Sequence, residues 1–143
     1  MPRQKAVYTD LTMLTLEQTE RELTRIVESF PEEIFFELNG GVLLKEETKY
    51  HPGRVADDLL ILGEYYRDRI FGRYIVIYYG SMRHVFRGAS DEVFLEELER
   101  VLKHELTHHL EHRAGERDLE IEDERELIHY YANHPQNIKH IED

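Results

Sequence analysis

The sequence predicts an α+β fold, with helices toward both ends of the chain and a small sheet between them. Three patterns indicate this class: apolar residues at helical spacing over about residues 15–30, a run of β-forming residues at Tyr74–Tyr79, and a long amphipathic pattern that begins near Ser90. The chain has 143 residues, the usual length of one domain, and no linker or repeat divides it. We therefore predict a single domain over residues 1–143.

The first helix is predicted from its start signal, its apolar spacing and its end. Thr15 and Gln18 fit a capping box, in which each side chain accepts a hydrogen bond from the other residue's backbone amide. Pro31 ends the pattern, because the residue before a proline avoids helical dihedral angles. The apolar positions of this helix are Leu16, Leu23, Ile26, Val27 and Phe30.

The middle of the chain has the period of β-strands. Ile34–Leu38 is short and apolar, the turn residues Asn39–Gly41 follow it, and Val42–Leu44 can return as its hairpin partner. Leu59–Tyr66 fits a strand or a short helix, whereas Tyr74–Tyr79 fits a strand covered on both faces. The short connections predict a sheet of about three or four strands, mostly antiparallel.

The last third of the chain is predicted to be helical again. Ser90 is a good N-cap, and the two acidic residues after it favour the positive end of the helix dipole. Gly115 is the expected C-cap, and a final helix is expected over about residues 120–132. The apolar face of the long helix consists of Phe94, Leu95, Leu98, Val101, Leu102, Leu106 and Leu110.

Composition narrows the possible functions. The net charge is −12, from 30 acidic and 18 basic residues, so we expect no nucleic-acid partner, because phosphate binding needs a positive surface. The absence of cysteine excludes disulfides, thiolate metal sites and cysteine nucleophiles. No apolar run is long enough to span a bilayer and the N-terminus lacks a signal peptide, so we expect a cytoplasmic protein without membrane association. The oligomeric state is left open.

The segment His104–His108 reads H-E-L-T-H inside the predicted long helix. Histidines four residues apart lie one turn apart on the same face, so both imidazoles can bind one zinc ion. Glu105 lies beside that face, where it can take a proton from a zinc-bound water that attacks a carbonyl. The alternative is a polar helix end whose histidines bind no metal.

Two further histidines on this helix are predicted to have other roles. His109 points into the apolar face and is expected to be packed there, with a hydrogen bond to a backbone carbonyl. His112 is one turn beyond His108 and can be a ligand in principle. Three successive turns of a straight helix diverge from one tetrahedral point, so an exposed histidine at the helix end is the preferred interpretation.

A catalytic zinc ion usually has three protein ligands and one open position. The leading candidate for the third ligand is Asp118, because Gly115 allows the chain to reverse and a carboxylate three residues later can return to the metal. Other acidic residues nearby remain alternatives. These are Glu111, Glu120, Glu122, Glu124 and Glu126.

The segment HELTHH, the later AGERD and the upstream GEYYRDRIFGRYIVIYYGS together resemble the small bacterial zincin-like metallopeptidases, or minimal zincins. The resemblance covers roughly Leu16 to Tyr131. It implies a zincin-like fold, in which the sheet packs with an N-terminal helix, the long helix that carries H-E-x-x-H and a C-terminal helix. It also implies hydrolysis of a peptide or protein substrate.

The family motif H-E-x-x-H-x-x-G-x-x-D assigns zinc binding to His104, His108 and Asp118 and the role of base to Glu105. This chain departs from the motif, because Glu111 stands where the motif has glycine, and G-x-x-D follows one helical turn later. The departure keeps Glu122 as an alternative third ligand.

The same resemblance suggests that a strand edge beside the active helix holds the substrate. Tyr74–Tyr79 is a candidate for that strand, with a buried core strand as the equal alternative, and Gly80–Phe86 can form the rim of the cleft. The alternative function is a zinc-binding module with little or no peptidase activity, which acts in regulation or partner binding.

Overall fold

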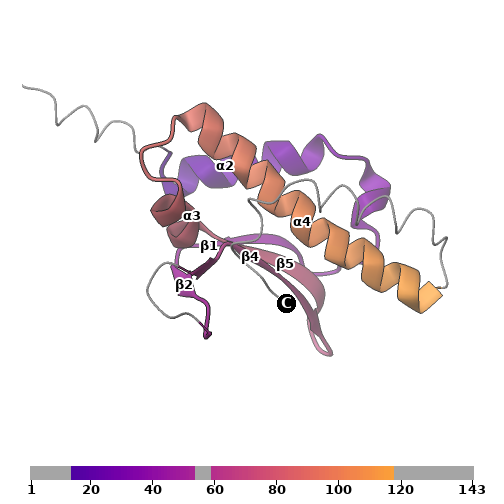
Figure 1. Cartoon of the computed structure of the whole chain (residues 1–143). Helices are drawn as coiled ribbons and strands as arrows, with labels where there is room; N and C mark the ends of the chain where they lie inside the picture. Colours follow the sequence, from indigo (N-terminus) through magenta and orange to yellow (C-terminus); the bar gives the residue numbers. More distant parts are fainter. Residues whose placement is uncertain (1–13, 54–58, 118–143) are drawn as a thin grey trace, which may run out of the picture.

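The computed structural model describes residues 14–53 and 59–117. Within these ranges the chain is α+β, as predicted, and two α-helices lie over one face of a small mixed sheet (Figure 1). The elements in chain order are α2 (Leu16–Glu28), the 3-10 helix η1 (Glu32–Phe35), β1 (Gly41–Lys45), β2 (Lys49–Tyr50), β3 (Leu60–Ile61), β4 (Gly63–Asp68), β5 (Gly72–Tyr78), α3 (Tyr79–Val85) and α4 (Asp91–Arg117).

Helix α2 begins at the predicted capping box. The Thr15 hydroxyl accepts a hydrogen bond from the Gln18 amide at 3.0 Å, and the Gln18 side chain accepts one from the Thr15 amide at 2.9 Å. The helix ends at Glu28, shortly before Pro31. Its apolar positions pack onto a core that is built mainly from β5 and α4, so the predicted amphipathic pattern is confirmed.

The main sheet has the strand order β1-β5-β4 and is mixed, so the predicted antiparallel pairing is confirmed for only one of its two ladders. Strand β1 pairs with β5 in parallel, whereas β4 pairs with β5 in an antiparallel hairpin. Ile34–Leu38 is not the hairpin partner of β1, because η1 and a turn occupy that segment. Strand β5 is central and paired on both sides, so Tyr74–Tyr78 is a core strand and its edges are not available to a substrate. Strands β2 and β3 form a separate two-stranded ladder.

Helix α4 crosses the sheet above β4 and β5 and carries much of the core (Figure 1). Ser90 caps its start, accepting a hydrogen bond from the Val93 amide at 3.2 Å, as predicted. Gly115 is not the C-cap, because the helix continues through it to Arg117. The final helix expected at about 120–132 lies outside the described residues. No helix in the described part is long and apolar enough to cross a membrane.

The segment Gly80–Phe86, a candidate for the rim of the cleft, mostly forms α3 and does not line the pocket beside His108. Its Met82 is fully buried in the main core. Gly80 allows this helix to pack closely, because a Cβ at that position would lie 2.8 Å from the Glu46 carbonyl oxygen.

The sheet face turned away from α4 carries a charged cluster that holds β4 in place. The Glu64 carboxylate accepts hydrogen bonds from Lys49 Nζ at 2.8 Å, from the Tyr78 hydroxyl at 2.7 Å and from the Tyr66 hydroxyl. Burial alone would raise the pKa of Glu64, but these hydrogen bonds outweigh it and hold the pKa below its ordinary value. The cluster thereby fixes the register of β4, whose other face meets α4.

Replacing this carboxylate gives a test of the cluster. We expect Glu64→Gln to lower the free energy of unfolding by about 1–3 kcal/mol at neutral pH, because the charged hydrogen bonds are lost. The folded-state pKa of Glu64 lies below its unfolded value of about 4.5, so its contribution is present above that pH and is lost as the pH falls through the lowered pKa. Urea titrations from about pH 3 to pH 7 should therefore show that the free energies of unfolding of the wild type and of Glu64→Gln converge at acidic pH.

The matched control is Glu22→Gln, which removes an exposed ion pair with Arg25 at 3.2 Å. We expect this variant to differ from the wild type by less than about 1 kcal/mol at every pH. A stability difference for Glu64→Gln that does not change with pH would contradict the role of the charge.

Candidate functional site

His104, Glu105 and His108 lie together on α4, as the H-E-x-x-H spacing predicted. One possible ligand atom from each residue lies within 4.8 Å of the others. The two imidazole rings have centroids 4.8 Å apart and are nearly perpendicular, at 83°. His104 and Glu105 are buried, at 3% and 1% exposure, whereas His108 is partly exposed. The group therefore opens to solvent on the His108 side.

The donor set suits a zinc ion. Zinc prefers imidazole nitrogens and carboxylate oxygens, and two ligands at a tetrahedral angle are roughly 3.4 Å apart. Donor atoms within 4.8 Å of one another can reach that spacing by small side-chain rotations. His104 Nε2 and Glu105 Oε2 are already 3.9 Å apart, so the carboxylate lies beside the first imidazole.

A glycine on β4 lets the strand approach the H-E-x-x-H helix closely. A Cβ at Gly63 would lie 2.9 Å from Val101 Cγ1 and 3.3 Å from Glu105 Cγ. The strand and the helix therefore contact each other at the turn of α4 that carries Glu105. The close approach restricts the space that is open to the Glu105 side chain.

His109 is packed in the core, as the sequence predicted. Its Nε2 is 2.8 Å from the Phe36 carbonyl oxygen, and a carbonyl can only accept, so Nε2 carries the proton. Burial lowers the pKa of His109, with Arg113 and Arg73 adding to the effect, so the ring stays neutral. Its Nδ1 therefore accepts a hydrogen bond from the Tyr65 hydroxyl at 2.8 Å.

A pocket of about 300 Å³ lies between β4 and α4 next to His108. It is lined by Tyr65, Arg67, His108, Glu111 and His112. Arg67 Nη1 donates a hydrogen bond to His112 Nδ1 at 2.9 Å, and Glu111 Oε1 is 3.8 Å from His108 Nδ1. The exposed member of the histidine pair thus faces a polar pocket that contains both a carboxylate and a guanidinium.

The predicted third metal ligand does not belong to the part of the chain that the structure describes. Asp118 lies outside the described residues, as do Glu120, Glu122, Glu124 and Glu126. The reversal at Gly115, from which the placement of Asp118 was inferred, is replaced by continuing helix. Among the described residues, the group that could share one ion is His104, Glu105 and His108, and it does not include Glu111.

His112 differs from the predicted exposed residue at a helix end. It is partly buried inside α4 and accepts its hydrogen bond from Arg67. Tyr65 and Arg67, which come from β4 and complete the pocket, were not predicted as site residues. Successive side chains of a strand point to opposite faces, so Tyr65 and Arg67 share one face of β4 while Glu64 and Tyr66 share the other. This alternation is the sequence signal that could have placed Tyr65 and Arg67 together on the face toward α4.

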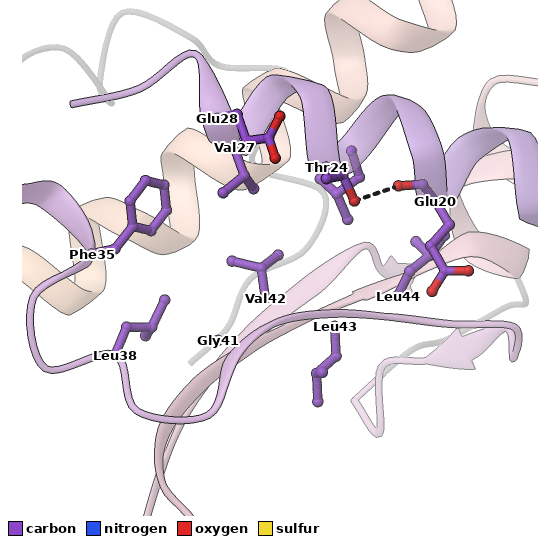
Figure 2. A pocket seen from close by; sticks show the side chains of 11 residues that line it. Glu20, Thr24, Val27, Glu28, Phe35, Leu38, Gly41, Val42, Leu43 and Leu44 are labelled. Atoms are coloured by element: carbon purple, nitrogen blue, oxygen red, sulfur yellow. Dashed lines mark hydrogen bonds between the residues drawn. The ribbon is translucent and has the colours of Figure 1, made fainter. Parts of the chain in front are cut away.

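A larger pocket of about 420 Å³ lies between α2 and β1 (Figure 2), and no histidine lines it. Its walls are mainly apolar, from residues such as Leu23, Val27, Phe35 and Val42, with Glu20 and Glu28 on the helix side. Thr24 in this pocket donates its hydroxyl hydrogen to the Glu20 carbonyl. The pocket brings together no set of metal ligands, so its size does not make it the candidate site.

No family model and no curated protein matches this chain. Among solved structures, a conserved hypothetical protein from Thermus thermophilus is similar, with 32% sequence identity and a TM-score of 0.61. The match covers 71% of this chain and 99% of that protein. At this identity and coverage, the chain belongs to the same protein family as the conserved hypothetical protein from Thermus thermophilus.

Proposed function

We propose that this protein is a zinc-dependent metallopeptidase of the zincin-like type. The observation that carries the proposal is the packing of His104, Glu105 and His108 into one group on α4, beside an open polar pocket. In this proposal the two histidines bind zinc, and a carboxylate from the acidic residues that follow α4, among them Asp118 and Glu122, completes the site. A bound zinc ion supplies an acidified water and polarises the scissile carbonyl.

The chain's own residues then perform the proton transfers. The Glu105 carboxylate takes the proton of the attacking water and delivers it to the leaving amine nitrogen, because it is close to His104 and restricted by Gly63. Tyr65 lines the pocket, but its hydroxyl hydrogen is donated to His109, so toward a ligand this hydroxyl can only accept. Tyr65 is therefore not the donor that stabilises the oxyanion in this arrangement.

The position of β4 supports an extended peptide as substrate. Within the described residues β4 is an edge strand of the main sheet, paired only with β5, and it lies next to the pocket. An extended peptide can add to such an edge through main-chain hydrogen bonds. In this proposal β4, and not Tyr74–Tyr79, is the strand edge that holds the substrate.

The first test is the metal content of the protein purified without added metal. Elemental mass spectrometry should find about one zinc per wild-type chain and a loss of most of it in His108→Ala. His84→Ala, a change of the exposed histidine on α3, serves as the matched control and should keep the metal. Absence of zinc from the wild type, with no uptake at pH 7, would contradict the proposal.

A zinc-binding module without peptidase activity is the alternative. Such a module would also bind zinc but would not transfer a proton in peptide hydrolysis. Metal content alone therefore cannot distinguish it from a peptidase. Substitution of Glu105 separates the two functions.

A further inference from the structure

Arg67 stands out among the charged side chains at the pocket. It is exposed on β4, and within the described part of the chain it forms no ion pair, although acidic residues outnumber basic ones by 30 to 18. Its one described hydrogen bond runs from Nη1 to His112 Nδ1. A guanidinium has five N–H donors, so most of its donor capacity remains for water or a ligand.

His112 holds this guanidinium in a defined place. A guanidinium can only donate, so His112 Nδ1 is the acceptor and the imidazole binds Arg67 in its neutral form. The His112 ring also lies near Tyr65, with centroids 6.3 Å apart, and it belongs to the same helix as the proposed zinc ligands. Arg67 is therefore anchored to α4 one turn beyond His108.

The other residues that line the pocket do not offer the same recognition. The Tyr65 hydroxyl hydrogen is committed to His109, and Glu111 is an acceptor beside His108. Of the described residues around this pocket, Arg67 is the one with a permanent positive charge. A carboxylate is the group that a planar guanidinium recognises with two parallel hydrogen bonds.

We propose that Arg67, positioned by His112, binds a carboxylate of the substrate next to the scissile bond. The inference rests on the proposed metallopeptidase function and names its substrate class: peptides with a negative charge near the cleavage point. The carboxylate comes from an acidic side chain or from the C-terminus of the peptide. The overall charge of −12 repels such substrates, so a local guanidinium is what retains them.

The test uses zinc-loaded protein and four small hydroxamates, which bind the metal without being hydrolysed. Each carries one amino acid: alanine with a free C-terminus, alanine amide, aspartate with an amidated C-terminus, and asparagine amide. The first and third carry a carboxylate, and the other two are their neutral counterparts. Calorimetry gives the four dissociation constants for the wild type, Arg67→Gln, Arg67→Lys and the control Arg69→Gln. Arg69 is exposed in the turn after β4 and carries the same charge.

We expect one carboxylate compound to bind the wild type about five to ten times more tightly than its neutral counterpart. The preference should disappear in Arg67→Gln, weaken in Arg67→Lys and persist in Arg69→Gln, while the neutral compounds bind all variants equally. Preference for the alanine acid identifies a C-terminal carboxylate, and preference for the aspartate amide identifies a side chain. Increasing salt should reduce the preference.

Two results would overturn the inference, and they differ in what they say of the metal site. Equal binding of charged and neutral hydroxamates to the wild type, or a preference that Arg67→Gln retains, rejects the carboxylate site and leaves the metal site intact. A wild type that binds neither zinc nor any hydroxamate rejects the metallopeptidase function and the inference with it.

Discussion

Glu105→Gln should reduce peptide hydrolysis by about 10²- to 10⁴-fold while about one zinc per chain remains bound. The amide keeps the size of the side chain but cannot take a proton from the attacking water. Glu105 is 1% exposed and lies beside His104, where a nearly isosteric replacement disturbs the packing little. Steady-state rates on a quenched peptide library and zinc content measured on the same preparations test both halves of the expectation.

Glu99→Gln is the matched control for this experiment. Glu99 is on the same helix, in a partly exposed ion pair with Lys103 at 3.3 Å. Its replacement should leave both the rate and the zinc content unchanged, since an exposed pair of this kind contributes little. A Glu105→Gln variant that hydrolyses peptides at the wild-type rate would reject the proton transfer. Zinc binding without hydrolysis in the wild type would favour the zinc-binding module.

The parts of the fold that could be predicted are those that local sequence determines. The capping box at Thr15 and the N-cap at Ser90 each act over about one turn, and the apolar runs on α2 and α4 extend over many turns. The parallel pairing of β1 with β5 joins segments about thirty residues apart, and no local signal encodes it. The short apolar segment Ile34–Leu38 fits a strand as well as a turn of 3-10 helix. The prediction of a strand assumed that Val42–Leu44 is its hairpin partner.

In the candidate site, too, the features determined by local sequence could be predicted, and those that depend on long-range packing could not. The grouping of His104, Glu105 and His108 follows from helical geometry, and the burial of His109 follows from its place on the apolar face. Tyr65 and Arg67 reach α4 only because β4 packs against it, more than forty residues away in sequence. The prediction that α4 ends at Gly115 was wrong, because a glycine lowers the stability of a helix without excluding one. The neighbouring Arg113 holds this part of α4 in place through its hydrogen bond to the Glu33 carbonyl.

His109→Leu should lower the free energy of unfolding by about 2–4 kcal/mol, the largest stability effect expected near the site. Leucine retains the apolar bulk but leaves the Phe36 carbonyl and the Tyr65 hydroxyl without their partner on α4. Chemical denaturation in the presence of a chelator measures this cost without a contribution from bound metal.

Tyr65→Phe separates the two hydrogen bonds, because it removes only the hydroxyl that donates to His109. We expect this variant to lose about 1 kcal/mol, and the double variant with His109→Leu to lose less than the sum of the two. Such coupling means that β4, α4 and the Phe36 loop are held together by one neutral imidazole, which keeps the pocket wall in place beside His108. Additive losses would mean that Tyr65 and His109 act independently, and the pocket wall would then depend on Gly63 and the Glu64 cluster instead.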